Sequence, residues 1–349
     1  MPARSSEPAP LGVEAIAALS AQVLERVSSV VVGMETSLEL ALASILAGGH
    51  VLFEDVPGLG KTLAARSIAA AIGLDFRRVQ CTPDLLPSDI TGSFVYQPSS
   101  SDFVFRPGPI FTGLLLADEI NRTSPKTQSA LLEAMAEGQV TVEGSSYPLP
   151  VPFHVIATSN PIEYEGTYAL PEAQLDRFMV RLAVGYPSRD GEQRVLLNRV
   201  ARQKEVASVE PVITADQLRA MQRGIEAVAV DEDIALYCVD LVNETREHPS
   251  VQVGASPRGA QGLMLVGRAL AVMAGRDYVT PEDIKRIAIP VLAHRLSLTP
   301  QAWANGTDPA AIVQEITEEV AGPPAVGASR GSGSGSAGAS TDGSSGSPR

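Results

Sequence analysis

The segment Glu54–Thr62, with the sequence EDVPGLGKT, has the residue types and spacing of a phosphate-binding loop. It follows an apolar run at Val51–Phe53, which predicts a buried strand, and its Lys-Thr pair opens a predicted helix. In such a loop, successive backbone N–H groups point inward and hold an anion. Lys61 would reach the β- and γ-phosphates of a nucleotide, and the Thr62 hydroxyl would ligate Mg²⁺. The nucleotide-binding residues predicted in this loop are Pro57, Gly58, Leu59, Gly60, Lys61 and Thr62.

The loop departs from the pattern G-x-x-x-x-G-K-[ST] at its first position, where Asp55 replaces glycine. Because that position only starts the turn, we expect phosphate contact to survive with altered local charge. The alternative interpretation of the segment is an ordinary glycine turn capped by a helix. The strand, turn and helix around the motif favour the phosphate-binding interpretation.

A second apolar strand, Leu114–Ala117, ends in two acidic residues, Asp118 and Glu119. In a parallel sheet such a run is buried on both faces. Asp118 at its carboxyl end would hold the magnesium ion, directly or through water. Glu119 would be free to polarise an attacking water as the catalytic base. Many strands end in acids at a turn, so this pattern alone is weak evidence for a nucleotide site. Its position after a phosphate loop, at this distance along the chain, makes the evidence stronger.

The composition limits the cellular setting. The chain of 349 residues has room for about two domains, and a hydrophobic content of 44% is enough for a core. No apolar run approaches the roughly twenty residues that span a bilayer, and the first residues lack the apolar stretch of a secretory signal. Two cysteines, Cys81 and Cys238, indicate neither a disulfide framework nor a metal cluster. We therefore expect a cytoplasmic protein without membrane insertion.

The charge balance bears on partners. Lysine and arginine number 27 and aspartate and glutamate 40, which gives a net charge of −13. Nucleic-acid-binding proteins usually carry a basic patch or stripe, and the basic residues form no long run here. The composition makes a nucleic-acid partner unlikely, although an acidic protein can still hold a local basic channel.

The pattern along the chain divides it into four parts. Residues 1–11 are expected to be disordered. Strands alternate with helices over residues 12–186, which predicts an α/β core with a parallel sheet covered by helices. Residues 187–321 show only helical patterns, and capping sequences predict helix starts at Thr214 and Thr280. Residues 322–349 are rich in glycine and serine and are expected to be a disordered tail.

The order of these motifs resembles that of the AAA+ ATPases and, within them, the MoxR family of the helix-2-insert clade. The resemblance covers about residues 12–300. Three stretches carry it: VQCTPDLLPSDITG at Val79–Gly92, LLLADEINRTSPKTQSALLEAM at Leu114–Met135, and TYALPEAQLDRF at Thr167–Phe178. It implies an AAA+ P-loop core with a parallel sheet, a small all-α lid, ATP and Mg²⁺ as cofactors, and a homo-oligomeric ring, commonly a hexamer.

The resemblance also implies catalytic roles for residues outside the phosphate loop and the acidic pair. Asn160, at the end of the strand Val155–Ser159, resembles the family's sensor 1, which orients the attacking water. Arg258 resembles the sensor 2 arginine, which reaches back to the phosphates. Arg177 is similar to the arginine finger that a neighbouring subunit supplies. The alternatives are an Asn-Pro turn for Asn160 and a surface salt bridge for Arg258.

Further residues have weaker support. Arg181, Arg122 and Lys126 are alternative candidates to face a neighbouring subunit, or else ordinary polar residues near element ends. Val32 and Gly33, before the first strand, would line the adenine pocket, or else form a plain loop between helices.

Two inserts match the family's helix-2 insert and its hairpin before sensor 1. The segment between Gly92 and Pro109 predicts two short strands around a Ser-rich turn, and the segment between Gln139 and Pro152 predicts a hairpin. Both would project toward the pore or one face of the ring. Phe94, Tyr96 and Tyr147 are candidate contacts for a client chain, or else packing residues of these hairpins.

Together these features predict a Mg²⁺-ATP-dependent ATPase of MoxR type that remodels or matures protein complexes in a chaperone-like way. The resemblance implies a protein client, often with a partner bearing a von Willebrand factor A domain. One alternative is a nucleotide-gated scaffold with little hydrolysis, against which Glu119 argues. Another is a metal-chelatase subunit or a DNA motor, both of which share the helix-2 insert.

Overall fold

The computed structural model describes residues 7–56, 58–161, 166–202 and 209–323. The tail predicted from residue 322 lies almost wholly outside this part of the chain. Residues 7–11, expected to be disordered, instead lie along a helix of the C-terminal half. The Leu11 N–H donates to the Ala220 carbonyl at 3.1 Å, and Glu7 pairs with Arg223 at 2.9 Å.

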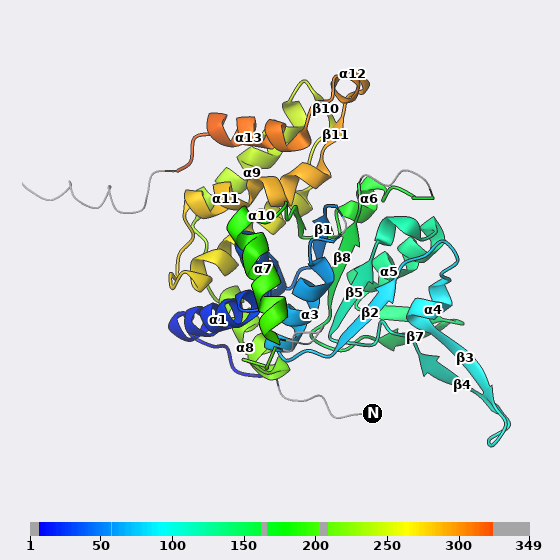
Figure 1. Cartoon of the computed structure of the whole chain (residues 1–349). Coiled ribbons are helices and arrows are strands. Elements are labelled where there is room, and N and C mark those ends of the chain that lie inside the picture. Colours follow the sequence, from blue (N-terminus) through cyan, green and yellow to red (C-terminus); the bar gives the residue numbers. More distant parts are fainter. Residues whose placement is uncertain (1–6, 57, 162–165, 203–208, 324–349) are drawn as a thin grey trace, which may run out of the picture.

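A five-stranded parallel sheet forms the centre of the molecule (Figure 1). Its strand order is β2-β5-β8-β1-β9, and every pairing is parallel. The parallel α/β core predicted from the sequence is therefore confirmed. The edge strand β9 was not predicted. The strands are β1 (Val51–Glu54), β2 (Phe76–Gln80), β5 (Leu114–Asp118), β8 (His154–Ser159) and β9 (Val180–Leu182).

Alternation along β5 explains why this strand is apolar up to Asp118. Leu114 and Leu116 of β5 belong to one buried cluster, whereas Leu115 and Ala117 belong to a second cluster on the opposite face. The helices of the N-terminal half that accompany the sheet are α1 (Val13–Ser28), α2 (Glu35–Leu46), α3 (Lys61–Ala71), α4 (Pro87–Thr91), α5 (Pro125–Glu137) and α6 (Glu172–Leu175), with a 3₁₀ turn at Ile120–Arg122.

The C-terminal half is helical apart from one short antiparallel ribbon. Thr214 and Thr280 cap their helices as predicted, each accepting a hydrogen bond from a backbone N–H three residues later. Helix α10 packs against α1 and α2, and its buried side chains share one cluster with those of the sheet. The elements are α7 (Arg189–Arg202), α8 (Ala215–Glu226), α9 (Glu232–Glu247), β10 (Val251–Val253), α10 (Pro257–Met273), α11 (Pro281–Leu292), η2 (Ala293–Arg295), β11 (Ser297–Leu298), α12 (Pro300–Ala304) and α13 (Pro309–Glu319).

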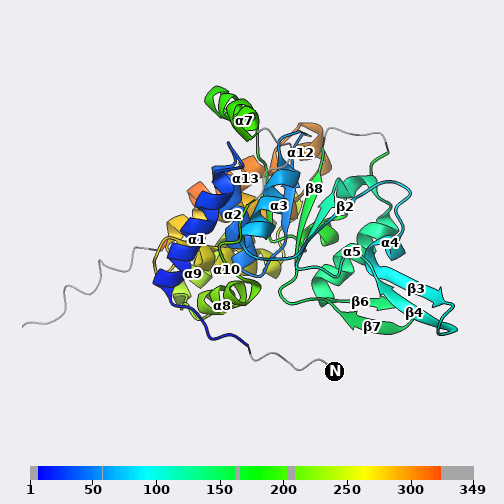
Figure 2. The ribbon, with the colours of Figure 1, turned by 60° about the horizontal axis from the view of Figure 1, so that its bottom comes forward.

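Both predicted inserts form hairpins, β3 (Gly92–Gln97) with β4 (Asp102–Pro107) and β6 (Gln139–Val142) with β7 (Ser145–Pro148). Figure 2 shows them side by side, projecting from the side of the molecule away from the helical half. Tyr147 stacks on Phe105 at 4.0 Å between ring centroids, and Phe94 lies 5.7 Å from the same ring. Tyr147 thus packs between the two hairpins and Phe94 packs within its own hairpin, whereas Tyr96 is half exposed.

A buried histidine joins the sheet to the helical half and should make stability depend on pH. The ring of His154 in β8 contacts the Gly49 carbonyl through Nδ1 at 2.9 Å and the Gln222 amide of α8 through Nε2 at 3.2 Å. Burial lowers the pKa of His154 to about 4, although its bond to Gly49 opposes the shift. The folded pKa lies below the usual value of about 6.5, so the unfolded chain binds more protons and stability is lost as pH falls from about 6.5 toward 4.

We expect His154 to account for a loss of about 2 kcal/mol in the free energy of unfolding between pH 7 and pH 5. Urea unfolding of the wild type and of His154→Gln at both pH values measures this contribution. The pH-dependent loss should be smaller in the variant by about that amount. Equal losses in the two proteins would contradict the assignment.

Candidate functional site

The phosphate loop has the backbone conformation that anion binding needs. It leaves β1 at Glu54 and enters α3 at Lys61. Gly58 and Gly60 have φ values of +88° and +83°, in the left-handed region where a side chain is strained. Gly60 is the N-cap of α3, so the first N–H groups of this helix face the loop. Pro57, predicted as part of this loop, lies outside the described residues.

A cavity of about 230 Å³ lies at the carboxyl ends of β1, β5 and β8. The structure brings together here residues predicted from three distant segments: Lys61, Asp118 and Asn160. Leu59 lies instead in a neighbouring apolar cavity. The lining residues are Gly58, Gly60, Lys61, Thr62, Arg78, Asp118, Glu119, Thr158, Ser159 and Asn160.

The cation and the hydroxyl of the loop point to different acceptors. Lys61 Nζ donates to the Asp55 carbonyl oxygen at 2.5 Å. Burial lowers the pKa of Lys61, and the negative charges of Asp55, Asp118 and Glu119 oppose this shift. Thr62 Oγ1 donates to Asp118 Oδ2 at 3.1 Å, so the two predicted metal ligands are already adjacent.

Three side chains hold Asp118: Thr62, described above, together with Thr158 and Arg78. Thr158 Oγ1 donates to its Oδ1 at 2.6 Å, and Arg78 contacts its Oδ2 through Nη2 at 2.7 Å and Nε at 2.9 Å. Arg78 lies on β2, the strand next to β5, and sequence reasoning missed it. The only signal would have been the pairing of β2 with β5, which brings Gln80 opposite Asp118.

The sequence suggested that Glu119 would be free. In the structure its carboxylate is instead hydrogen-bonded. Its Oε2 accepts hydrogen bonds from Gln80 at 2.7 Å and from Arg122 at 3.0 Å. Its backbone lies in the left-handed region at φ +58°, which costs a non-glycine residue about 1–2 kcal/mol. The Glu119 N–H donates to Thr158 Oγ1 at 2.8 Å, so one hydroxyl joins the backbone of Glu119 to the carboxylate of Asp118.

An apolar cavity of about 460 Å³ adjoins the phosphate loop and shares Gly58 and Gly60 with the first cavity. Val32 lines it, as predicted for a base pocket. Gly33 lies beside it, and a Cβ there would stand 3.0 Å from Pro187 Cβ. Sequence reasoning missed the other apolar walls: Val30, Val31, Leu63, Tyr186, Pro187, Val195 and Leu196.

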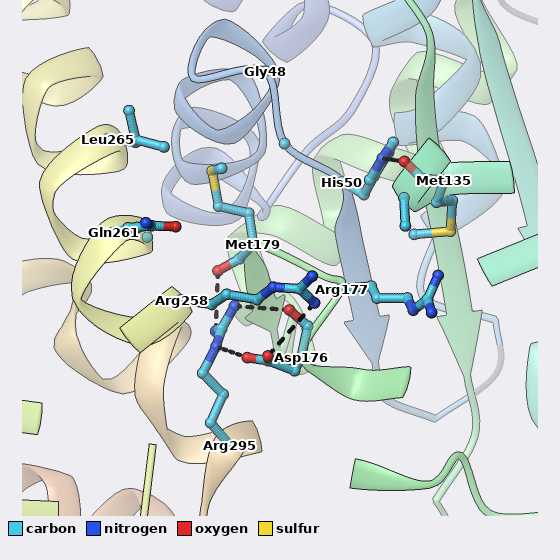
Figure 3. A pocket seen from close by; sticks show the side chains of 13 residues that line it. Gly48, His50, Met135, Asp176, Arg177, Met179, Arg258, Gln261, Leu265 and Arg295 are labelled. Atoms are coloured by element: carbon cyan, nitrogen blue, oxygen red, sulfur yellow. Dashed lines mark hydrogen bonds and ion pairs between the residues drawn. The ribbon is translucent and has the colours of Figure 1, made fainter. Parts of the chain in front are cut away.

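Arg177 and Arg258 do not lie in the phosphate cavity. Both line a third cavity, of about 240 Å³, near the amino ends of β1 and β9, where His50 and Met179 are also found. Figure 3 shows Arg258 and Arg295 both directed at Asp176, with ion-pair distances of 3.8 Å and 2.8 Å. Arg177 donates to the Leu132 carbonyl.

The expectation that Arg258 reaches the phosphates of its own chain is therefore not met. The physical reason is the position of α10. Its N-cap Ser256 and its first-turn residue Arg258 both contact Asp176, which lies just before β9. The phosphate cavity lies at the opposite, carboxyl edge of the same sheet. Arg181 pairs with Glu54 at 2.9 Å, and Arg122 contacts Glu119 within the chain. Lys126 is exposed in the first turn of α5.

Comparison with known proteins shows the family to which the chain belongs. The model of the ATPase family associated with various cellular activities matches residues 50–180, and the AAA lid domain model matches residues 243–316. Over 330 residues the chain is 40% identical to Chaperone MoxR1 of Mycobacterium tuberculosis, covering 91% of this chain and 86% of that protein. The chain belongs to the MoxR family of AAA ATPases.

Two further proteins are similar to this chain. Protein YeaC of Bacillus subtilis is 51% identical over 302 residues, which cover 86% of this chain and 94% of that protein. A crystal structure from Cytophaga hutchinsonii, of a protein assigned as an ATPase, superposes with a TM-score of 0.82 at 40% identity. It covers 88% of this chain and 96% of that one. Residues 243–316, within the helical half of this MoxR protein, match an AAA lid domain.

The described residues offer neither a metal cluster nor a membrane-spanning helix. No group of three or more histidine, cysteine, aspartate or glutamate side chains in this part of the chain could hold a metal ion by itself. Within the same described ranges, no helix is long and apolar enough to cross a bilayer.

The hydroxyl of Thr158 should be needed both for stability and for the geometry of the acidic pair. Thr158→Val keeps the shape but leaves the partly buried Glu119 N–H without its acceptor and removes a donor from Asp118. We expect a loss of about 1–3 kcal/mol in the free energy of unfolding. Urea denaturation measures it.

Thr158→Ser is the matched control because it keeps the hydroxyl and loses only a methyl group. It should retain most of the stability that Thr158→Val loses. If both variants are destabilised equally, packing of the methyl group and not the hydrogen bonds explains the effect.

Proposed function

We propose that this MoxR protein is a Mg²⁺-dependent ATP hydrolase that uses turnover to remodel or mature protein complexes. The observation that carries the proposal is the convergence of Lys61, Asp118 and Asn160 on one cavity. An apolar pocket of suitable size for a base continues from it across the phosphate loop.

The residues present fit a magnesium nucleotide. Thr62 Oγ1 and Asp118 Oδ2 are oxygen ligands of the kind that Mg²⁺ prefers, and they lie 3.1 Å apart. When bound, Mg²⁺ neutralises charge on the β- and γ-phosphates. Lys61 and the N–H groups that open α3 would bind the same phosphates. Val32 and Gly33 would lie along the adenine, with the base between the α1–α2 connection and α7.

Glu119 is the proposed general base for attack of water on the γ-phosphate. To act, its carboxylate must exchange its bonds to Gln80 and Arg122 for a bond to water. Asn160 lines the same cavity and is 4% exposed, a position suited to orient that water. The carboxylate therefore changes partners before it can take a proton.

Arg177 and Arg258 are proposed to serve the site of a neighbouring copy. Both line a cavity at the amino edge of the sheet that is separate from the phosphate cavity of their own chain. Supplied in trans, an arginine of this kind contributes on the order of 10³–10⁵ in rate. This division of the site supports a homo-oligomeric ring, and a hexamer is the size that the family resemblance implies.

For the client we propose only its chemical class, a protein. A relative is called Chaperone MoxR1, which supports a protein client for this chain too. A partner with a von Willebrand factor A domain and a cytoplasmic location stay predictions. The scaffold alternative predicts ATP binding without turnover, and a DNA motor would be stimulated by single-stranded DNA, so turnover assays with and without DNA distinguish them from the proposal.

Replacement of Glu119 by glutamine should abolish turnover while ATP binding is preserved, because the amide cannot accept the proton of the attacking water. A fall of about 10²–10⁴ in kcat is expected. Phosphate release measures turnover, and calorimetry measures binding. Glu137→Gln, an exposed residue at the end of α5, is the control for charge. An unchanged rate in Glu119→Gln would refute the role of Glu119.

Mixing inactive variants should restore activity if Arg177 acts in trans. Arg177→Ala chains retain Glu119, and Glu119→Gln chains retain Arg177, so an interface between them holds one intact set. Random mixing should return roughly a quarter of the wild-type rate, since one interface in about four has the productive order. Steady-state ATPase assays of the mixture measure this recovery.

The control mixture is Lys61→Ala with Glu119→Gln. Both changes lie in the same phosphate cavity, so no interface of that mixture holds an intact set and no recovery is expected. Recovery in the control, or none in the Arg177→Ala mixture, would argue against a site shared between chains.

A further inference from the structure

The carboxylate of Asp55 stands in the phosphate loop, where a negative charge should repel a polyanion. Its charge is taken up by three backbone N–H groups. Oδ2 accepts from Val184 at 2.8 Å and from Gly185 at 2.6 Å, and Oδ1 accepts from Val56 at 2.7 Å. Burial alone would raise the pKa of Asp55, but these bonds and the charge of Lys61 lower it. The carboxylate is therefore ionised and fully engaged.

The two donors to Oδ2 belong to the connection between the core and the lid. Val184 and Gly185 follow β9, and Gly185 turns the chain with a φ of +70°. The next two residues, Tyr186 and Pro187, are walls of the apolar cavity. Pro187 also packs against Gly33, where a Cβ would come within 3.0 Å. Asp55 thus joins the phosphate loop to the far wall of the base pocket.

Lys61 adds a second link at the same residue. Its Nζ donates to the Asp55 carbonyl oxygen, so the backbone of Asp55 contacts the phosphate-binding lysine while its side chain holds the connection. The two ends of the proposed nucleotide site meet at one residue. A glycine at this position would keep the backbone contact and lose the bonds to Val184 and Gly185.

We infer that Asp55 is a positioning residue that fixes the base-pocket wall at Tyr186–Pro187 relative to the phosphate loop, and so sets the affinity for the nucleoside part of ATP. This inference rests on the proposed ATP binding. It assigns a role to the residue by which the loop departs from the usual glycine. Its consequence is that Asp55 distinguishes a nucleotide from a bare polyphosphate.

The test compares ATP with inorganic tripolyphosphate, which has the phosphates but no base or ribose. In Asp55→Asn, one oxygen must serve three donors, and in Asp55→Gly the side chain is absent. We expect at least a tenfold loss of ATP affinity by calorimetry, with unchanged or tighter tripolyphosphate binding because a negative charge is removed. In turnover assays the rise in KM should exceed any fall in kcat.

Glu54→Gln is the matched control, because it removes a neighbouring charge whose partner is Arg181 and not the connection. It should keep the wild-type ratio of ATP to tripolyphosphate affinity. Thermal unfolding checks that each variant is folded, and Asp55→Gly, which restores the usual loop residue, serves if Asp55→Asn is not.

Three results would overturn the inference: equal losses for both ligands, equal gains for both, or no change in either Asp55 variant. Each would mean that Asp55 acts on the phosphate loop alone or not at all. Failure of the proposed function looks different, since the wild-type protein would then bind neither ATP nor tripolyphosphate.

Discussion

The parallel pairing of β5 between β2 and β8 is the constraint on which the site depends. It puts the carboxyl ends of all three strands at one edge of the sheet, so that Gln80, Asp118 and Ser159 end adjacent strands. One hydroxyl from β8, that of Thr158, then bridges Asp118, the last residue of β5, and Glu119, which follows it. Because β1 pairs with β8 on its other side, the phosphate loop opens at the same edge.

Electrostatic balance explains the partners that surround the acids. Two carboxylates at the edge of a buried strand are costly unless each is paired. Arg78 pairs with Asp118, and Arg122 with Gln80 neutralises and holds Glu119. Arg78 contacts the same oxygen, Oδ2, that accepts from Thr62. A magnesium ion held by Asp118 would therefore share this oxygen with Arg78 or displace it.

The sequence allowed site residues to be predicted where they directly follow an apolar strand. The phosphate loop, the acidic pair and Asn160 each follow an apolar run, and the structure puts them together. Arg78 and Gln80 could not be found in this way, because strand order depends on tertiary pairing and β2 precedes β5 by more than thirty residues. The position of Arg258 was missed for a related reason: it depends on how α10 packs against α1 and α11, which no local pattern determines.

The arginine cavity completes the physical argument for a shared site. Three arginines, Arg177, Arg258 and Arg295, line it with a single carboxylate, Asp176. Arg295 is almost fully buried; burial lowers its pKa, Asp176 opposes that shift, and Arg258 adds to it. Like charges that share a cavity are stabilised by an anion, and the proposed phosphate cavity of the same chain lies at the other edge of the sheet. A triphosphate held by a second chain is one anion that this cavity could meet, and the proposed supply of Arg177 and Arg258 in trans uses that arrangement.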